Sequence, residues 1–573
     1  MRLYLLGKFF RICFLILVVV LWYHQIIKGQ YFSHLSNENR VRIIPLIPER
    51  GDILDTKGRK IATNFMSYDV IAIPQELNND ESVLINLEKI LDIPADKLQK
   101  TYHANYTSPF APVTLVKNIP LEKMFRIEEL RPNLGGIEIQ ANYRRIYPFE
   151  ETGAHMIGYL SEINMRELEK LKPYGYGIKN TVGKSGVEKK FDLYLRGTPG
   201  GKQIEVDNRG NSVRILGEKE SVPGKNIGLT IDIEWQEKAH QLLSGLRGVI
   251  LVMDIKDGKM LVTESSPSFN PNLFVSGNST EMRSLLNSPN SPLLNRAVSA
   301  NFSPGSIFKL VTAIAGLESK KINEYSKYVC EGKLLIGNEE FDCWEKNGHG
   351  NQNIIEAITH SCNIFFYKLG LKVGPGKICD SARMLGLGEY SGIGFEGETA
   401  GLIPNPAWKN LEHKEKWFNG DTLNMSIGQG FILASPIQIL RLVSCVGNGG
   451  FLVKPYIIQS IAGIPVRDNR REYSGIRNET LNLLREGMFH VVNSAGGTGN
   501  RARVEGLDIA AKTATVQTTK GNTHAWISGF LPYENPKLSF VIFLEYGGRG
   551  GVETADICQQ FFTSLKEQVL SYQ

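Results

Sequence analysis

The most constraining feature of this sequence is a nearly continuous apolar run, Leu3–Tyr23, that is broken only by a glycine and two basic residues, Lys8 and Arg11. At a rise of 1.5 Å per residue, about 20 apolar residues in a helix cross the hydrocarbon core of a membrane. The basic residues lie near the N-terminal end of the run, and Trp22 and Tyr23 lie at its other end. This polarity is typical of a span whose N-terminus faces the cytoplasm.

The residues that follow the run, His24 to Ile27, offer no small-x-small cleavage site, which favours an uncleaved anchor over a removed signal peptide. The alternative of a buried core helix would require a packing partner far from the rest of the chain. We therefore predict a cytoplasmic N-terminus at residues 1–8 and a transmembrane anchor at 9–27. The bulk of the chain is then extracytoplasmic, in a single-pass protein of the cell membrane.

The overall composition is that of a globular protein. The 573 residues are 42% hydrophobic and 22% charged, values that exclude a collagen-like, a largely disordered and a small disulfide-rich chain. A net charge of +6 is small for this length, and no long Lys/Arg run is present, so we expect no nucleic-acid partner. Seven cysteines are too few for a disulfide framework.

The pattern of expected strands and helices changes near residue 226. Residues 28–225 contain short strand-like runs, helical stretches and Gly/Pro-rich turns without a concentrated catalytic signature. After residue 226, segment 248–265 predicts a hairpin, segments 524–532 and 537–548 predict a second one, and a long helical pattern begins near Ser306. Strands at both ends with helices between them indicate an α+β domain, in which a sheet packs against a helical cluster.

The string SPGSIFK places a nucleophile and a base three residues apart. On a helix, Ser306 and Lys309 share a face, so the hydroxyl and the amine can come within hydrogen-bonding distance. A lysine whose pKa is lowered by burial or by neighbouring cations can take the serine proton. Because Pro304 and Gly305 suit a helix start, we expect Ser306 at a helix N-terminus, where free amides favour a developing oxyanion.

Two further elements turn this weak pattern into a specific one. Ser361-Cys362-Asn363 lies 55 residues after Ser306 (361 minus 306), within a pattern that predicts a helix. Lys512-Thr513-Ala514-Thr515 lies 206 residues after Ser306 (512 minus 306) and enters a strand-like segment. Three such elements in this order form the signature set of serine acyltransferases that react with penicillin.

The sequence resembles the class B penicillin-binding proteins, which are monofunctional peptidoglycan transpeptidases. The resemblance covers almost the whole chain, and within the family segments 143–161 and 203–216 are most similar to the elongation branch, penicillin-binding protein 2. It implies a transpeptidase domain at 226–573 with an antiparallel sheet among helices, and an elongated pedestal of the dimerisation type at 28–225. The segments that carry the resemblance besides the three elements are 50–58, 143–161, 183–200, 229–236, 264–272, 424–438 and 524–530.

The resemblance implies a role for each motif residue. Ser306 attacks the D-Ala–D-Ala carbonyl of a stem peptide and becomes acylated, with Lys309 as its base. Ser361 and Asn363 extend the hydrogen-bond network, carry a proton to the leaving D-Ala and orient the substrate. An amine of a neighbouring stem peptide then attacks the acyl-enzyme, so that a cross-link forms.

The third element is expected to bind the substrate carboxylate. The resemblance implies that Lys512 supplies positive charge for this group and lowers the pKa of Lys309, while Thr513 and Thr515 hold the carboxylate or its β-lactam mimic. The backbone amides of Ser306 and Thr515 then form the oxyanion hole. Ala514 departs from the glycine that is usual at its position, and its methyl group is expected beside the cleft, where it sets the strand slightly further from the substrate.

A second cluster predicts a metal. Cys330, Cys343, His349 and Cys362 are separated by 13, 6 and 13 residues, and three sulfurs with one imidazole suit tetrahedral Zn²⁺. A structural zinc would tie the loop that begins at residue 330 to the segment of Ser361, with Asp342 as a reserve ligand. A Cys330–Cys343 disulfide or unpaired buried thiols remain as alternatives.

Other functions are weighed against a transpeptidase of wall elongation. A division-type transpeptidase, a D,D-carboxypeptidase and a β-lactamase use the same nucleophile, but we identify no candidate carboxylate of the class A β-lactamase type that would activate a deacylating water. A β-lactam sensor is expected to carry several spanning helices, and a scaffold protein would not react at Ser306. Asp421 and Asn424 are predicted to order a loop, and Gln429-Gly430 to form a turn.

The resemblance also implies partners. These are peptidoglycan stem peptides on glycan derived from lipid II, β-lactam antibiotics, and membrane proteins of the elongation complex. Since residues 51–225 match the pedestal, the chain lacks a glycosyltransferase module of its own. A SEDS-type (RodA-like) glycosyltransferase is therefore the expected supplier of nascent glycan.

Overall fold

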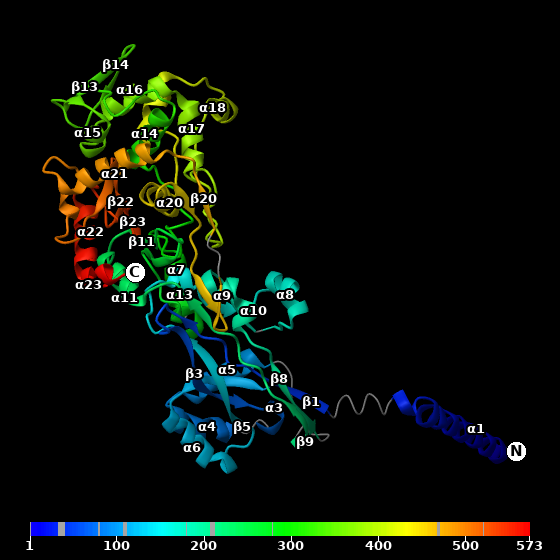
Figure 1. Cartoon of the computed structure of the whole chain (residues 1–573). Coiled ribbons are helices and arrows are strands. Elements are labelled where there is room, and N and C mark those ends of the chain that lie inside the picture. The colour runs from blue at the N-terminus through cyan, green and yellow to red at the C-terminus, as the bar shows by residue number, and fades with distance from the viewer. Residues whose placement is uncertain are drawn as a thin grey trace. The chain divides into compact units, whose positions relative to one another are not determined.

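The computed structural model describes residues 2–31, 41–77, 81–106, 112–178, 180–206, 212–277, 279–466, 470–518 and 521–572 (Figure 1). Part of the elongation-type segment 203–216, residues 207–211, lies outside these residues. The chain divides into two compact units. The first unit comprises Met1–Gly51, Asn64–Arg145 and Arg196–Lys225, and the second comprises Asp52–Thr63, Ile146–Leu195 and Asn226–Gln573.

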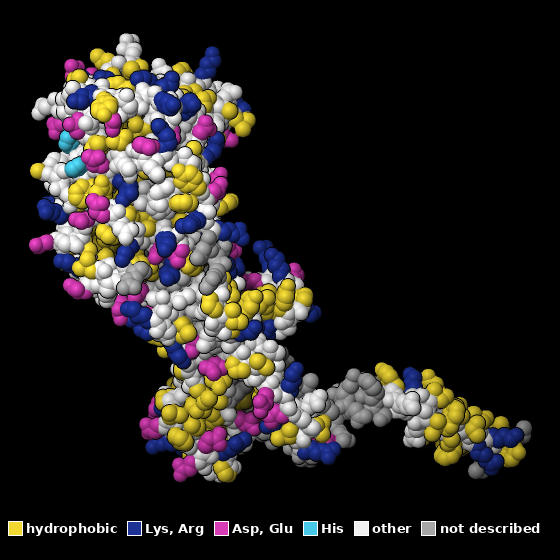
Figure 2. All heavy atoms as spheres, viewed as in Figure 1, with side chains coloured by type: hydrophobic (Ala, Val, Ile, Leu, Met, Phe, Trp, Pro, Cys, Tyr) yellow, Lys and Arg dark blue, Asp and Glu magenta, His cyan; other side chains and the backbone are white. Residues whose placement is uncertain are grey.

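The expected anchor is a helix. Helix α1 (Arg2–Trp22) continues through a π-helical turn, η1 (Tyr23–Ile27), and the apolar span Tyr4–Ile27 has no buried residue. Figure 2 shows this helix covered with apolar side chains, with basic groups toward its N-terminal end. Within the described residues, it is the helix long and apolar enough to cross a membrane, and it fits a single-pass anchor.

The rest of the first unit is built on two sheets. Strands β1, β8 and β9 form one sheet in the order β1-β8-β9, and β3 pairs with β4 and β5 in the other. The helices of this unit supply leucines and isoleucines to a core that includes Val70, Leu87, Leu98 and Ile127. The strands and helices are β1 (Val41–Leu46), β3 (Lys60–Ala72, begun in the second unit), α3 (Pro74–Leu77), α4 (Glu81–Leu91), α5 (Ala95–Asn105), β4 (Val113–Ile119), α6 (Leu121–Glu129), η2 (Arg131–Asn133), β5 (Ile137–Ile146), β8 (Gly200–Val206) and β9 (Ser212–Lys219).

The second unit contains the sheet that the two predicted hairpins form. Strands β11 (Gly248–Asp254), β12 (Met260–Ser266), β21 (Ala510–Gln517), β22 (Thr523–Leu531) and β23 (Leu538–Leu544) pair antiparallel in the order β12-β11-β23-β22-β21. The first and last parts of the domain therefore meet at the β11–β23 pair. Strand β21 is left at the edge, where alternate backbone N–H groups face away from the sheet.

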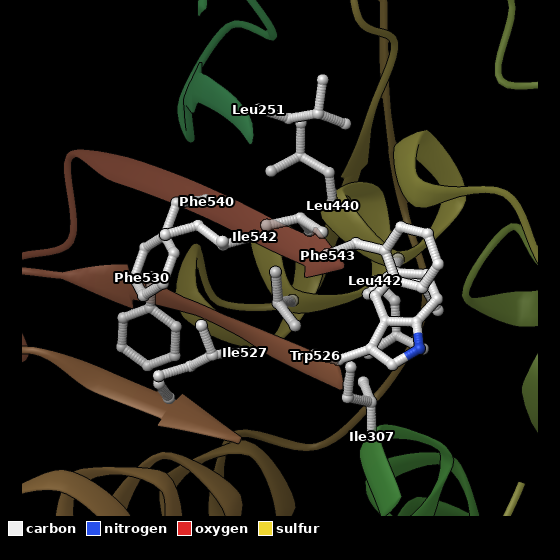
Figure 3. Packing of buried hydrophobic residues seen from close by; sticks show 14 of the residues in the cluster. Leu251, Ile307, Leu440, Leu442, Trp526, Ile527, Phe530, Phe540, Ile542 and Phe543 are labelled. Carbon is white, nitrogen blue, oxygen red and sulfur yellow. The ribbon is translucent and has the colours of Figure 1, made fainter. Parts of the chain in front are cut away.

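Helices cover both faces of this sheet. Helix α20 (Pro436–Gly447) packs against β11, β22 and β23, while α11 (Ile233–Leu242) and α22 (Glu553–Ser564) pack together on the other side (Figure 1). All residues of α20 are buried, and its buried polar side chains Gln438 and Arg441 donate hydrogen bonds to backbone carbonyl oxygens of neighbouring segments. In Figure 3, Leu440 and Leu442 of α20 lie beside Phe543, and Ile307 points toward Trp526.

The helical cluster carries the remaining motifs. It consists mainly of α14 (Lys309–Glu318), α15 (Ile354–Thr359), α16 (Asn363–Val373), α17 (Pro375–Met384), α18 (Pro406–His413), α19 (Asn419–Ser426) and α21 (Asn478–Asn493). The sheet and this cluster confirm the predicted α+β arrangement of an antiparallel sheet packed among helices. The other elements of the second unit are β2 (Ile53–Leu54), α7 (Ala154–Ile157), β6 (Leu160–Glu162), α8 (Met165–Leu171), η3 (Lys172–Tyr174), β7 (Thr181–Gly183), α9 (Gly186–Lys190), α10 (Asp192–Leu195), β10 (Ile227–Leu229), α12 (Asn272–Ser276), α13 (Ser279–Leu286), η4 (Gly305–Phe308), β13 (Tyr328–Cys330), β14 (Lys333–Ile336), β15 (Glu339–Asp342), β16 (Gly350–Gln352), β17 (Phe451–Val453), β18 (Ile458–Ile461), β19 (Ile464–Pro465), β20 (Arg471–Tyr473), η5 (Asn500–Ala502) and α23 (Lys566–Ser571).

Candidate active site

The catalytic turn, residues 303–309, begins tighter than the sequence suggests. We expected an α-helix from Ser306, but Gly305–Phe308 form a 3₁₀ turn (η4) and the α-helix starts at Lys309. In a 3₁₀ turn the side chains at i and i+3 eclipse each other, so Ser306 and Lys309 still lie on one side. Ser306 is partly exposed, whereas Lys309 is fully buried.

Gly305 brings the catalytic turn against the edge strand. It adopts a left-handed backbone conformation, φ +53°, and a β-carbon there would lie 2.5 Å from Cγ2 of Val516 and 3.2 Å from the methyl of Ala514. Only glycine fits without displacing β21. The Ala514 methyl therefore faces the catalytic turn, which gives a physical meaning to the Ala-for-Gly departure in the third motif.

Ser361 occupies a break between two helices rather than the helix that the pattern predicts. Helix α15 ends at Thr359 and α16 starts at Asn363, and Ser361 between them has a φ of +52°. A left-handed conformation at a non-glycine residue costs on the order of 1 kcal/mol and is typical of functional sites. It turns the Ser361 side chain out of both helices and toward the two motif lysines.

The three motifs converge on the Ser361 hydroxyl. The Nζ of Lys309 donates to Oγ of Ser361 at 3.2 Å, to the Ser361 carbonyl oxygen at 2.7 Å and to Oδ1 of Asn363 at 2.7 Å. The Nζ of Lys512 donates to the same Oγ at 2.9 Å and to the Thr513 carbonyl oxygen at 3.1 Å. Residues that lie 52 and 151 positions from Ser361 thus form one polar network in a buried site.

Burial makes one neutral amine available. It lowers the pKa of Lys309 from 10.5 to about 8 and also lowers the pKa of Lys512, which the charge of Lys309 depresses further. Burial is the main cause of the lowered pKa at both lysines, and the repulsion between their positive charges acts in the same direction. Because two ammonium groups around one hydroxyl repel each other, the pair favours a state with a single charge.

The threonines of the third motif keep hydroxyl protons available. Oγ1 of Thr515 accepts a hydrogen bond from the Gly550 N–H at 3.0 Å, so its own proton is free to point elsewhere. Oγ1 of Thr513 lies 2.8 Å from Oγ1 of Thr498, and one of these two hydroxyls retains a proton for a substrate. The sequence analysis missed Thr498 and Gly550, although both lie in glycine-rich stretches that signal a close backbone approach.

The predicted metal ligands lie together. The ligand atoms of Cys330, Cys343, His349 and Cys362 are all within 4.8 Å of one another. Nδ1 of His349 is 3.6 Å from Sγ of Cys330 and 3.5 Å from Sγ of Cys343. Zn–S bonds of about 2.3 Å and a Zn–N bond of about 2.0–2.1 Å give a tetrahedron with S–N edges of about 3.6 Å. The residues therefore fit a tetrahedral zinc ion.

The alternatives for this cluster fare differently. All seven cysteines are described, and each is a free thiol, so the structure contains no Cys330–Cys343 disulfide. The reserve ligand Asp342 is exposed and lies outside the cluster, and its backbone carbonyl accepts a hydrogen bond from Nδ2 of Asn363 at 3.2 Å. Cys362 joins the cluster to the active site, because it also accepts the Phe365 N–H at the start of α16.

Comparison with known proteins decides the family. Residues 248–563 match the model of the penicillin binding protein transpeptidase domain, and residues 45–229 match that of the penicillin-binding protein dimerisation domain. The chain belongs to the penicillin-binding proteins. Among curated relatives, peptidoglycan D,D-transpeptidase MrdA of Haemophilus influenzae is 32% identical over 94% of this chain and 87% of its own length. MrdA of Escherichia coli K12 is 30% identical over 93% of this chain and 89% of its own.

Solved structures of penicillin-binding protein 2 agree with this family. The complex of Helicobacter pylori penicillin-binding protein 2 with MreC contains a chain that is 29% identical, with a TM-score of 0.83 over 93% of this chain and 99% of that one. A peptidoglycan synthase complex that coordinates polymerization and crosslinking contains a chain with 29% identity and a TM-score of 0.76 over 98% of both. The predicted resemblance to the elongation branch of the penicillin-binding proteins is thereby confirmed.

Proposed function

We propose that this chain is an elongation-type peptidoglycan D,D-transpeptidase in which Ser306 forms the acyl-enzyme. The observation that carries this function is the Ser361 hydroxyl, which two buried lysines from distant segments share beside the catalytic turn. Two curated relatives that match this chain over 87% and 94% of their own length are named peptidoglycan D,D-transpeptidase MrdA. Division-type and sensor functions have no comparable support.

In the acylation step, Oγ of Ser306 attacks the carbonyl carbon of the penultimate D-Ala of a stem peptide. The Lys309 amine accepts the proton of Oγ, and backbone N–H groups of Ser306 and Thr515 stabilise the oxyanion. The peptide C–N bond then breaks. The proton passes through the Ser361 hydroxyl to the nitrogen of the departing D-Ala, and an ester remains on Ser306.

The substrate carboxylate lies, in this proposal, at the edge strand. Thr513, Thr515 and the positive charge shared by Lys309 and Lys512 form the complement to that charge. In the second step a primary amine of another stem peptide attacks the ester carbonyl. A new amide bond forms, the bond to Oγ of Ser306 breaks, and the amine proton returns to Oγ through Lys309.

The function is tested with a depsipeptide or thioester donor that mimics the D-Ala–D-Ala end, together with an amine acceptor. The full chain in detergent is expected to release the leaving group and to form a product in which donor and acceptor are joined, detected by mass spectrometry. Release of the leaving group with only hydrolysed donor would instead identify a D,D-carboxypeptidase.

Acylation by a β-lactam is expected to depend on pH through Lys309. The base must be neutral, and its pKa is about 8, so the second-order rate constant should rise about tenfold per pH unit below pH 8 and level off above it. The measurement is the rate of labelling by a fluorescent penicillin between pH 6 and pH 10. A rate that stays constant over this range, with the melting temperature also constant, would contradict the role of Lys309 as base.

We propose that Cys330, Cys343, His349 and Cys362 hold one structural zinc ion. The support is the tetrahedral spacing of the ligand atoms and the donor set of three thiols and an imidazole. A bound zinc ion supplies no catalytic step here. It crosslinks the segment 330–352 to Cys362 and so holds the left-handed conformation of the adjacent Ser361.

We also propose that the N-terminus is cytoplasmic, that the second unit is periplasmic, and that the chain works with a RodA-like glycosyltransferase and other elongation proteins. The support is the positive charge near the N-terminal end of the anchor and the relatives solved with MreC and in a synthase complex. Co-purification of such partners with the full chain, and their loss when residues 2–27 are removed, tests this proposal. Equal recovery without the anchor would refute an anchor-dependent partnership.

A further inference from the structure

A small cavity is lined by residues that directly follow a contact of the catalytic turn, and none of its lining residues belongs to the three motifs. The carbonyl oxygen of Gly428 accepts hydrogen bonds from the N–H of Gly305 at 2.9 Å and from Oγ of Ser303 at 2.7 Å. The chain continues from Gly428 into Gln429, which lines a cavity of about 200 Å³ together with residues of α19. From the sequence, Asp421 and Asn424 are predicted to order a loop and Gln429-Gly430 to form a turn, beside and within the segment 424–438 that carries the family resemblance.

The walls of the cavity are held rigidly. Nε1 of Trp417 donates to Oγ1 of Thr422 at 2.8 Å, and the ring of Phe431 packs on the rings of Trp408 and His413, with centroids 5.2 and 4.8 Å away. Such fixed aromatic faces lose little conformational entropy when a ligand binds. They also attract an ammonium group through their π faces.

Three polar groups in the cavity have no hydrogen-bond partner among the described residues: one carboxylate oxygen and two side-chain amides. Asp421 is held through Oδ2 by Nζ of Lys409 at 2.7 Å and by the Phe418 N–H at 2.8 Å, which leaves Oδ1 without a partner among the described residues. The side-chain amides of Asn424 and Gln429 have no hydrogen bond to any described residue. Each amide offers one acceptor and two N–H donors, the complement of a peptide backbone.

The reaction requires two peptides of opposite chemistry at one serine. The donor peptide ends in a carboxylate, which the cations and threonines around β21 suit. The acceptor peptide carries a primary amine. Although Oδ2 of Asp421 is paired with Lys409, its Oδ1 and the aromatic rings of the cavity suit an amine better than a carboxylate. Gly305 links the two places, since it faces Ala514 and Val516 of β21 and donates a hydrogen bond to Gly428, the chain neighbour of the cavity residue Gln429.

We propose that the cavity lined by Trp417, Asp421, Asn424, Gln429 and Phe431 binds the acceptor stem peptide, at the residue that carries the attacking primary amine. A volume of about 200 Å³ suits one amino-acid residue. The proposal rests on the transpeptidase function of Ser306. In the bound state the neutral amine attacks the ester carbonyl of the acyl-enzyme, an amide bond forms, the ester bond to Oγ of Ser306 breaks, and the amine proton passes to Oγ.

The test separates acylation from transfer to the amine. The full chain in detergent receives a thioester donor and one of two acceptors. The first acceptor is a stem tetrapeptide with a free side-chain amine, and the second is hydroxylamine, which is too small to use the cavity. The variant Asn424→Ala/Gln429→Ala removes both free amides, and Gln241→Ala, an exposed amide on α11, is the matched control. The readouts are the ratio of aminolysis to hydrolysis and the rate of labelling by a fluorescent penicillin.

We expect the double variant to need about tenfold more tetrapeptide for the same aminolysis ratio, because two hydrogen bonds are lost. The rates of its penicillin labelling and of its reaction with hydroxylamine should stay within twofold of the wild type, and its melting temperature should stay within 2 °C. The same is expected of the control variant. An unchanged tetrapeptide ratio overturns the proposal. So does a parallel loss of penicillin labelling, which would place the cavity with the donor. A wild-type chain without any acyl-enzyme would overturn the proposed function itself.

Discussion

Replacing Ser306 with alanine is expected to abolish covalent labelling by a fluorescent penicillin, with a fall in the labelling rate of at least about 10⁴-fold. The physical reason is the position of the Ser306 hydroxyl. It is partly exposed, and it lies three residues before the buried Lys309, on the same side of the 3₁₀ turn. The measurement is in-gel fluorescence after a fixed incubation, with mass spectrometry of the labelled peptide from the wild-type chain.

The matched control for this variant is Ser303→Ala. Ser303 lies in the same turn, and its hydroxyl donates to the Gly428 carbonyl oxygen, so its loss is expected to slow labelling only a few-fold. The melting temperature of Ser306→Ala should remain within 2 °C of the wild type. Label retained on Ser306→Ala, or on a peptide that does not contain residue 306, would refute the assignment of the nucleophile.

Loss of the metal cluster is the second large expected effect. The purified wild-type chain should contain about one zinc ion. The Cys330→Ser variant should bind much less zinc, and its melting temperature should be roughly 4–8 °C lower. Penicillin should label this variant about tenfold more slowly than the wild type. The slower labelling follows from the position of Ser361, which precedes the ligand Cys362 in a left-handed conformation. Metal content by elemental analysis and thermal unfolding provide the measurements.

A buried thiol outside the cluster provides the control for the zinc experiment. Cys379 is buried and its Sγ donates to the Pro404 carbonyl oxygen, so Cys379→Ser changes a thiol of similar burial without touching the proposed ligands. This variant should retain its zinc. Wild-type protein without zinc, in which only five of the seven thiols react after unfolding, would establish the disulfide alternative instead.

Local sequence patterns predicted the elements well where one physical rule dominates. Alternating and continuous apolar runs gave the hairpins at 248–265 and 524–548, because the strands of a covered sheet are buried. The apolar run at the N-terminus gave the single anchor helix in the same way. The patterns failed at Ser306 and Ser361, where a 3₁₀ turn and a left-handed residue replace the expected α-helix. At both places contacts with distant segments outweigh helix propensity.

The cavity beside Gln429 shows the same limit. Nothing in the pattern of Asp421, Asn424 and Gln429 distinguishes a binding surface from an ordered loop. The distinction depends on which amide groups remain without a hydrogen bond, and on the fixed orientation of Trp417 and Phe431. Such properties exist only once α18, α19 and the catalytic turn have packed together.

The sequence alone determined the type of fold and an apolar N-terminal helix that fits a membrane anchor, and it predicts the nucleophile with its motif partners and the donor set of a metal cluster. These follow from residue types, spacing and family motifs, which the chain carries locally. Only the tertiary structure decided that Ser361 is the shared centre of two lysines, that burial lowers the pKa of Lys309, and that Ala514 faces Gly305. Hydrogen bonds and contacts between residues 52 to 209 positions apart (361 minus 309, and 514 minus 305) depend on packing, and packing is not encoded in any single segment.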